Sequence, residues 1–197
     1  MSVATLYDVH GNLAALEAVL AEIPDDATIV VGGDVCYLGK QPAETLERLR
    51  AMGDRVIWVR GNTDRELTAE SHLSDEQSAF LHELPPTAQI DRVLYCHATP
   101  RNDMDIFTER TPEERIAFLF EDVDADVVVC GHTHMQFERT IAGKRVINSG
   151  SVGLPFEEKP GAYWTFDLEH RFTPYAGAPA PERTRADALA EFTRIGL

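Results

Sequence analysis

Short motifs rich in Asp, Asn and His are the most informative feature of this chain. Each of them directly follows an apolar run. In chain order they are Asp8-Val9-His10-Gly11-Asn12, Gly33-Asp34, Gly61-Asn62-Thr63-Asp64, Cys96-His97 and Gly131-His132-Thr133-His134. Carboxylate, amide and imidazole groups supplied from several strand ends are typical of a metal site. The motifs therefore indicate metal-assisted hydrolysis.

The spacing inside two motifs supports a shared ligand position. Residues two apart on an extended segment point the same way, so we expect Asp8 to converge with His10, and His132 with His134. Taken alone, each motif also has an ordinary explanation, because Asp and Asn are common in turns and at helix starts. Two imidazoles after a buried Val run are harder to explain this way, since they need polar partners. The occurrence of all the motifs in one chain favours the metal site.

Apolar runs precede the motifs and predict the elements that position them. Buried strands are expected at Val3–Tyr7, Ala27–Val31, Val56–Val59, Arg92–Tyr95 and Asp126–Cys130. Helical spacing of apolar residues is found between them, at Leu13–Ile23, Leu46–Met52, Phe80–Leu84 and Ile116–Phe120. This alternation predicts an α/β sheet covered on both faces, with the motifs beyond the carboxyl ends of the strands, where ligands gather.

The rest of the chain continues this pattern and then changes in composition. Further strands are expected at Arg145–Asn148 and Ala162–Phe166. After Tyr175 a turn-rich spacer, Ala176–Pro181, precedes a predicted helix over Glu182–Ile195, which packs on the sheet or forms a homo-oligomer contact. A length of 197 residues fits a single domain, 1–197, with this spacer and helix starting at about residue 176.

The order of the motifs resembles the calcineurin-like metallophosphoesterase superfamily, in particular its small bacterial and archaeal phosphodiesterase branch. The resemblance extends from Val3 to about Leu168. It includes Asn148–Pro155, which is similar to that branch's Asn-x-Gly-Ser segment. The resemblance implies an α/β fold with a four-layer α-β-β-α sandwich and two metal ions at the top of its central sheets. It is specific for the superfamily and says little about the substrate.

Transferred motif by motif, the resemblance implies two sets of metal ligands that share Asp34 as a bridge. The first set is Asp8, His10, Asp34 and His134, and the second is Asp34, Asn62, His97 and His132. Every position holds a suitable residue, which implies an active enzyme. Four imidazoles, two carboxylates and one amide, without a thiolate, suit Mn, Fe, Ni, Co or Zn better than Ca or Mg. We expect two divalent ions, and manganese is the favoured metal.

Two such ions can activate a bridging water and hold a phosphoryl group. We predict a phosphodiesterase that hydrolyses small phosphodiesters by attack of a metal-bridging hydroxide, with Asp34, Asn62 and His97 acting through the metals. The alternatives are a nucleotide pyrophosphohydrolase acting on dinucleoside polyphosphates, a phosphomonoesterase, and a metal-stabilised protein-binding module. A formal charge of −15 disfavours long nucleic acids and acidic membranes, and favours a small phosphorylated substrate or nucleotide.

The chain departs from the family pattern directly after Asn62. Several branches of the superfamily have His there, thought to protonate the leaving group, whereas this chain has Thr63. A hydroxyl is a poor acid near neutral pH, so esters with good leaving groups are expected to react fastest. Asp64 and Arg65 are candidates for assisting by their position in sequence, and for Arg65 an ion pair with a neighbouring acid is equally open.

Three further residues are candidate substrate contacts. The resemblance places Asn12 beside the metals as a phosphate contact, and its alternative role is to cap the helix that begins near Leu13. The segment Thr99–Thr111 lacks periodicity and is interpreted as a loop over the site, where Arg101 and Asn102 could contact substrate. A linker packed on the core is the alternative for this segment.

Cysteine usage and hydropathy bear on the cellular location. The thiols are odd in number and lack a Cys-x-x-Cys spacing, which favours buried free thiols in a reducing compartment; they are Cys36, Cys96 and Cys130. The sequence shows neither a signal-like start nor a long apolar span. We therefore expect a cytoplasmic protein.

Overall fold

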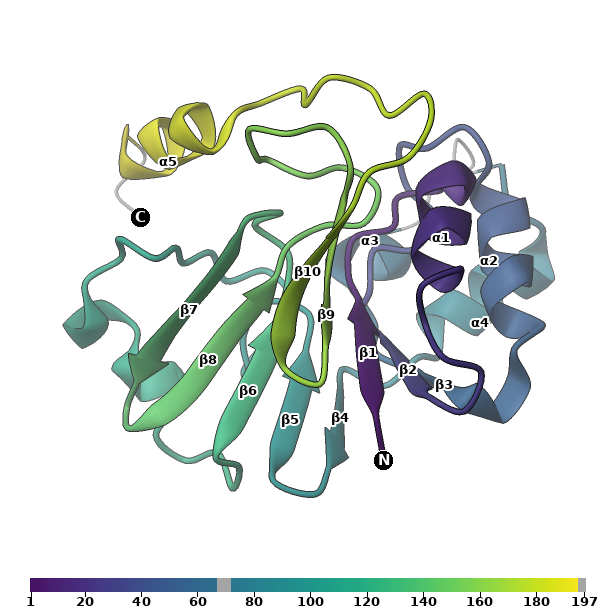
Figure 1. The fold of residues 1–197 in the computed structure, drawn as a ribbon. Coiled ribbons are helices and arrows are strands. Elements are labelled where there is room, and N and C mark those ends of the chain that lie inside the picture. The colour runs from purple at the N-terminus through teal and green to yellow at the C-terminus, as the bar shows by residue number, and fades with distance from the viewer. Residues whose placement is uncertain (67–71, 195–197) are drawn as a thin grey trace.

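A computed structural model describes residues 1–66 and 72–194 of the chain. Within these residues two five-stranded sheets stand side by side (Figure 1). The first has the order β10-β9-β1-β2-β3 and the second β4-β5-β6-β8-β7. In each sheet three neighbouring strands are parallel, β1-β2-β3 and β5-β6-β8, and the other two strands pair antiparallel.

The strands are short. Those of the first sheet are β1 (Val3–Leu6), β2 (Thr28–Val31), β3 (Val56–Trp58), β9 (Ala162–Phe166) and β10 (Glu169–Thr173). Those of the second are β4 (Thr87–Ile90), β5 (Val93–Cys96), β6 (Val127–Cys130), β7 (Gln136–Ile141) and β8 (Lys144–Ser149). The seven strands expected from the sequence are all present within a residue or two, whereas β4, β7 and β10 were not expected.

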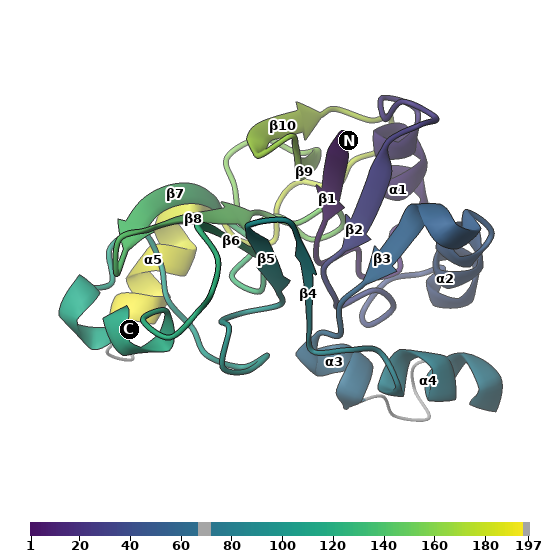
Figure 2. The same cartoon turned by 90° about the horizontal axis from the view of Figure 1, so that it is seen from below.

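Helices cover the outer faces of the two sheets (Figure 2). They are α1 (Leu13–Leu20), α2 (Pro42–Arg50), α3 (Asn62–Arg65), α4 (Asp75–His82) and α5 (Arg185–Arg194). Short 3-10 turns are found at η1 (Gly53–Arg55), η3 (Glu113–Arg115) and η4 (Ala117–Leu119). Helices α1 and α2 lie on one side of the sandwich and α5 lies on the other, so the predicted four-layer α-β-β-α fold is confirmed.

Local sequence explains where the helices begin. Asn12 caps α1 by accepting a hydrogen bond from Ala15 N at 3.1 Å. Pro42 occupies the first turn of α2, where its missing N–H costs nothing. The C-terminal helix starts at Arg185, three residues later than predicted, because the Thr184 hydroxyl caps it by accepting from Asp187 N at 3.2 Å. Its predicted end at Ile195 lies outside the described residues.

One predicted helix is wrong. The segment Ile116–Phe120 contains the 3-10 turn η4 and no α-helix, and η3 ends directly before it. Ile116, Leu119 and Phe120 are nevertheless buried in the core beneath the second sheet, so the apolar spacing correctly predicted which side chains are buried. Over five residues, periods of 3.0 and 3.6 give nearly the same pattern, and the sequence could not separate them.

Three apolar cores hold the layers together. One packs α1, α2 and α4 on the first sheet, and another packs α5 and the 3-10 turns on the second. The third fills the space between the sheets and consists of Tyr7, Val30, Val59, Tyr95 and Val129. Buried side chains of this size stabilise a fold by about 1.5–3 kcal/mol each. The inter-sheet core therefore fixes the carboxyl ends of β1, β2, β5 and β6 relative to one another.

None of the described helices is long and apolar enough to cross a membrane.

Candidate metal centre

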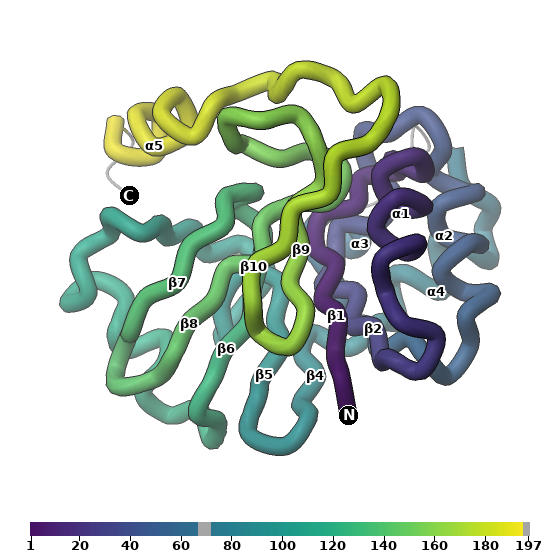
Figure 3. Tube along the Cα trace, viewed as in Figure 1, coloured from purple at the N-terminus to yellow at the C-terminus, as the bar shows by residue number. Residues whose placement is uncertain are grey.

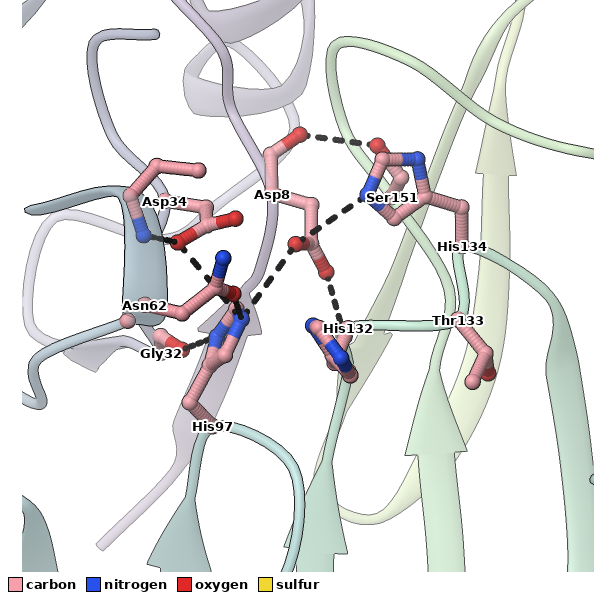
Figure 4. A network of polar contacts seen from close by, with 12 residues as sticks. Asp8, Gly32, Asp34, Asn62, His97, His132, Thr133, His134 and Ser151 are labelled. Atoms are coloured by element: carbon pink, nitrogen blue, oxygen red, sulfur yellow. Dashed lines mark hydrogen bonds and ion pairs between the residues drawn. The ribbon is translucent and has the colours of Figure 1, made fainter. Parts of the chain in front are cut away.

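The loops that follow β1, β2, β3, β5 and β6 bring the predicted ligands together at one end of the sandwich (Figure 4). Potential ligand atoms form two groups, and within each group all of them lie within 4.8 Å of one another. One group is Asp8, His10 and His134, and the other is Asp34, His97 and His132. The two groups match the division into two sets that the resemblance implied. Their role as metal ligands remains a prediction.

The backbone at these residues is left-handed rather than extended. Positive φ angles are found at Asp8 (53°), His10 (48°), Asp34 (55°), His132 (66°) and His134 (59°). The expectation that Asp8 and His10 converge by strand alternation is therefore wrong in its geometry, although the two side chains do converge. Non-glycine residues in this region carry steric strain and cluster at functional sites.

Three imidazoles are held in one orientation by backbone carbonyls. Nδ1 lies 2.9 Å from Tyr37 O in His10, 2.9 Å from Gly32 O in His97 and 2.6 Å from Leu154 O in His134. A carbonyl only accepts, so each Nδ1 carries the proton and donates it. In the neutral ring Nε2 then presents a lone pair, which is the form that binds a metal.

These lone pairs point at one another and at carboxylates. Nε2 of His10 lies 3.2 Å from Nε2 of His134, and Nε2 of His134 lies 3.3 Å from Asp8 Oδ1. Asp8 Oδ1 is buried and accepts no hydrogen bond from the described residues. Converging acceptors without a donor repel one another unless a cation lies between them. The donor chemistry of this group therefore fits a divalent metal ion.

Asp34 lies between the two groups of ligand atoms. Its Oδ2 is 4.0 Å from His10 Nε2, and its Oδ1 is 3.5 Å from His97 Nε2. Asn62 joins the second group, because its Oδ1 lies 3.1 Å from His97 Nε2. One carboxylate that faces both groups can serve two ions at once, as the resemblance implied for Asp34.

Three of the four pKa shifts at the site favour the protonation state that binds a metal. Burial lowers the pKa of His10, and burial with the neighbouring His97 lowers the pKa of His132 to about 4. Burial opposes ionisation of Asp8, but the imidazoles around it, His134 first, hold its pKa below the usual range. For His97 the carboxylates of Asp34 and Asp8 outweigh burial and raise its pKa. The neutral form is thus favoured for His10 and His132 and the ionised form for Asp8, whereas the pKa of His97 is shifted toward its protonated form.

Asp64 positions the site and does not face it. Its fully buried carboxylate accepts hydrogen bonds from the backbone N–H groups of Asp34 (2.8 Å), Gly61 (2.9 Å) and Val35 (3.0 Å). All of its contacts are thus with the two turns that carry Asp34 and Asn62. These bonds support a positioning role for Asp64, because both of its oxygens already accept from the backbone. The role of leaving-group acid considered for Asp64 stays a prediction.

Two glycines allow these turns to touch. A Cβ on Gly33, whose φ is +96°, would lie 2.4 Å from Gly61 N, and one on Gly61 would lie 2.2 Å from Asp34 Oδ1. Both distances are far inside van der Waals contact. The turns can therefore share Asp64 only because neither glycine has a side chain.

Residues of the Asn-x-Gly-Ser segment brace the ligand loops, a role that the sequence did not reveal. Asn148 Nδ2 donates to Gly131 O at 2.7 Å and to Thr133 Oγ1 at 3.0 Å. The Ser151 hydroxyl donates to Asp8 O at 2.7 Å (Figure 4). The segment thus fixes the loops of Asp8 and of His132 and His134 against each other. Its polar residues directly after a buried strand were the available signal.

Asn12 and Arg65 are both engaged within the protein. Besides capping α1, Asn12 donates from Nδ2 to Gly153 O and to the Tyr175 hydroxyl, each at 3.0 Å. Arg65 makes a forked pair with Asp103, from Nε at 3.1 Å and Nη2 at 3.2 Å. For Arg65 the alternative of an acid partner is thus observed, and for Asn12 the capping role is. Contact of either residue with a phosphate remains a prediction.

Among the described residues, no hydrogen bond or ion pair joins Arg101 or Asn102 to the predicted metal ligands. Arg101 pairs with Asp105 at 3.2 Å and lies over the Phe118 ring at 5.5 Å. Asn102 Oδ1 accepts from the backbone N–H groups of Met104 and Asp105, which forms a turn within the loop. Within the described part of the chain, the hydrogen bonds between Asp103 and Arg65 join the segment Thr99–Thr111 to the turn that carries Asn62.

A cavity of about 500 Å³ opens beside His10. Its lining combines the loop at Leu38–Gln41, the turn at Gly153 and Leu154, and residues from Tyr175 onward. Sequence reasoning did not anticipate this cavity, because its walls are separated by more than a hundred positions in the chain.

Comparison with known proteins agrees with this geometry. Residues 1–171 match the family model of the calcineurin-like phosphoesterase superfamily domain. Phosphodiesterase YfcE of Escherichia coli K12 is 30% identical over 173 residues, which cover 81% of this chain and 84% of that protein. A symmetrical bis(5′-nucleosyl)-tetraphosphatase of Pectobacterium carotovorum is 36% identical over 72 residues, covering 35% of this chain and 26% of that protein.

Among solved structures, a metallophosphoesterase from Sphaerobacter thermophilus superposes with a TM-score of 0.76, covering 100% of this chain and 94% of that one at 23% identity. At this identity the likeness shows the fold alone. The family match and the similarity to YfcE carry more, because they cover most of the chain. The protein belongs to the calcineurin-like phosphoesterase superfamily, and is a hydrolase of that class.

Proposed function

We propose that the protein is a phosphodiesterase that hydrolyses small phosphodiesters at a centre of two divalent metal ions. The observation that carries the proposal is the pair of converging ligand groups with Asp34 between them, together with the Asp8 oxygen that lacks a donor. Asp8, His10, Asp34 and His134 would hold one ion, and Asp34, Asn62, His97 and His132 the other.

The ions would activate water and neutralise charge on the phosphate, and manganese, iron, nickel, cobalt or zinc suits the nitrogen and oxygen donors. The protein's own part is to hold these donors in place. His10, His97 and His134 keep the metal-binding tautomer because carbonyls take their Nδ1 protons. Asp34 keeps its orientation because Thr63 N donates to its Oδ1 at 2.9 Å. Such preorganisation lowers the cost of reaching the transition state.

Protonation of the leaving group favours reactive esters. Thr63 has a buried hydroxyl without a hydrogen-bond partner among the described residues, and Asp64 is occupied by backbone donors. The Thr63 hydroxyl is a poor acid near neutral pH, and the Asp64 oxygens face backbone donors, so diesters whose leaving group departs as a stable anion are the expected substrates. The three free, buried thiols are consistent with a cytoplasmic location.

Hydrolysis of bis-p-nitrophenyl phosphate and p-nitrophenyl phosphate tests the proposal. Chelator-stripped protein is resupplied with each candidate metal, and the bound metal is counted in parallel. We expect turnover that needs metal, prefers the diester and reaches two ions per chain. Preference for the monoester would favour a phosphomonoesterase instead.

Two substitutions at the site separate an enzyme from a binding module. Asp34→Asn and His97→Ala are expected to abolish turnover and lower the bound metal. Their matched controls, Asp54→Asn and His82→Ala, replace exposed residues and should preserve both properties. Loss of bound metal in both site variants, with no turnover by the parent protein, would make the centre structural. Normal metal binding by the variants would refute the ligand assignment.

A second candidate is a nucleotide pyrophosphohydrolase. It is favoured by the local similarity to the bis(5′-nucleosyl)-tetraphosphatase and by the cavity beside His10. Product analysis with diadenosine tetraphosphate decides the matter, because cleavage of an anhydride releases nucleoside phosphates. Cleavage of this compound at a higher kcat/KM than bis-p-nitrophenyl phosphate would replace the phosphodiesterase proposal.

A further inference from the structure

The cavity beside His10 lies where part of a substrate must go. His10 belongs to one of the proposed ligand groups and also lines the cavity. At about 500 Å³ the cavity falls within the range of about 300–1,000 Å³ that is common for small-molecule sites. A phosphate held by the ligand groups would leave most of this space to a group esterified to it.

One wall of the cavity comes from outside the family domain. The match to the family model ends at residue 171, whereas Tyr175, Pro179 and Glu182 line the cavity. They belong to residues 174–184, a segment without helix or strand that runs above both sheets from β10 to α5 (Figure 3). The cavity is therefore shaped by a part of the chain that the shared catalytic fold does not supply.

Both ends of this segment are anchored close to the site. At its start the Tyr175 hydroxyl accepts from Asn12 Nδ2 at 3.0 Å. At its end Arg185, a quarter exposed, pairs with Glu157 at 2.9 Å and with Glu109 at 2.6 Å. Arg183 lies 5.5 Å from the Phe156 ring, which itself packs 4.7 Å from the His134 ring. The wall is thus connected to the ligand loops at both ends, which fixes its distance from the metal centre.

The chemistry of the lining suits a flat group with polar edges. Tyr175 offers an aromatic ring, and Leu38 and Leu154 offer apolar surface. Leu38 is 68% exposed with a φ of +74°, so the backbone holds an apolar side chain in solvent at the cavity rim. Gln41 and Glu182 add hydrogen-bonding groups without adding positive charge.

The charge of the lining residues distinguishes two groups that could occupy the cavity, a chain of further phosphates and a neutral nucleoside. Apart from His10, Lys40 is the one basic side chain among the lining residues, and Glu182 opposes it with a carboxylate. A chain of further phosphates would need several cations, as proteins that bind polyphosphates provide. A neutral nucleoside, with a base to stack and hydroxyls to hydrogen-bond, needs only the groups that are present.

We propose that this cavity binds the nucleoside of a nucleotide phosphodiester, with its base packed on the Tyr175 ring. The inference rests on the proposed function, since it names the substrate class of the same site. Tyr175 is then a specificity-determining residue, and its hydroxyl, held by Asn12, sets the position of the ring.

Calorimetric binding to the metal-loaded protein tests the inference. The probes are adenosine 5′-monophosphate, thymidine 5′-monophosphate and methyl phosphate, which share the phosphate and differ in the esterified group. We expect at least one nucleotide to bind about fivefold or more tightly than methyl phosphate, the factor for the weakest base–aromatic stack. Tyr175→Ala should remove this preference, whereas Tyr175→Phe keeps the ring and should retain most of it.

A matched control is Phe118→Ala, which removes an exposed aromatic ring from a separate surface cavity and should retain the preference. Hydrolysis of bis-p-nitrophenyl phosphate is followed on the same samples. Turnover without a nucleotide preference, or a preference that survives Tyr175→Ala, overturns this inference alone. Nucleotide preference without turnover of any diester refutes the proposed function, and with it the assignment of the cavity to a substrate.

Discussion

Replacing Asp64 with Asn tests how the metal centre is positioned. Asp64 Oδ2 accepts from both Asp34 N and Gly61 N, and Oδ1 accepts from Val35 N. An asparagine amide has one accepting oxygen and a donating NH2 group. Asp64→Asn can therefore keep the two bonds of Oδ2 but places its NH2 group against the Val35 N–H.

The size of the effect follows from these three bonds. A buried N–H left without an acceptor costs about 1–3 kcal/mol, and each of the other two bonds weakens by about 1 kcal/mol when its acceptor loses its charge. Burial and the nearby Asp34 raise the pKa of Asp64 to about 7, while the backbone donors oppose that rise. The raised pKa means that burying the ionised carboxylate is costly, and a neutral Asn relieves this cost, which offsets the weaker bonds to its Oδ1. In mildly alkaline buffer, where Asp64 is ionised, we therefore expect a net loss of about 1–3 kcal/mol from the unpaired Val35 N–H.

Urea unfolding of the metal-free protein measures this loss, and metal titration measures the effect on the site. Because Asp64 orients Asp34 and the turn of Asn62, we expect metal affinity to fall about 10- to 100-fold. The control is Asp54→Asn, which changes the same group at an exposed position. Unchanged stability and metal affinity, with turnover lost only for esters of poor leaving groups, would refute the positioning role and restore Asp64 as the acid.

Three further changes have expected outcomes. Arg65→Ala is expected to lower the free energy of unfolding by less than about 1 kcal/mol, because the guanidinium paired with Asp103 is more than a third exposed; a large rise in KM with unchanged stability would assign Arg65 to the substrate. Burial lowers the pKa of His170 in the fold, so its contribution to stability is present above the unfolded pKa and is lost as the pH falls through the folded value. Comparing urea unfolding of His170→Gln with the parent protein across this range should show a shallower loss in the variant, and parallel curves would contradict it. Chelation is expected to preserve far-ultraviolet circular dichroism, and metal at 100 times its Kd should then stabilise by about 2.7 kcal/mol.

The sequence predicted the strands whose own residues are apolar enough to indicate burial, whichever neighbouring strand they pair with. Strands β2 and β6 consist largely of Ile and Val and are buried along most of their length. In contrast, β10 (Glu169–Thr173) buries only Thr173 and contains charged residues. It is ordered by its antiparallel ladder with β9, which depends on a partner that local sequence does not name.

The residues of the candidate site likewise divide into those that the sequence could predict and those that it could not. Residue types and order were sufficient to nominate the ligands, because a donor set of this kind has few other uses. The positions of Asp64, Asn148 and Ser151 were not accessible, since their bonds go to backbone atoms of loops distant in sequence. Substrate contacts were the least predictable, because the cavity is assembled from three separate segments.

The left-handed ligand residues are stabilised by hydrogen bonds between the loops that carry them. Asp8 N donates to Gly33 O at 3.1 Å, His10 N donates to Asp34 O at 2.9 Å, and Gly131 N donates to His97 O at 2.8 Å. Each bond joins the loop of one ligand to the loop of another. The strain of these residues is therefore offset by the folded protein before any ion arrives. Because the donors are already in place, binding of the proposed ions would not need to order the chain.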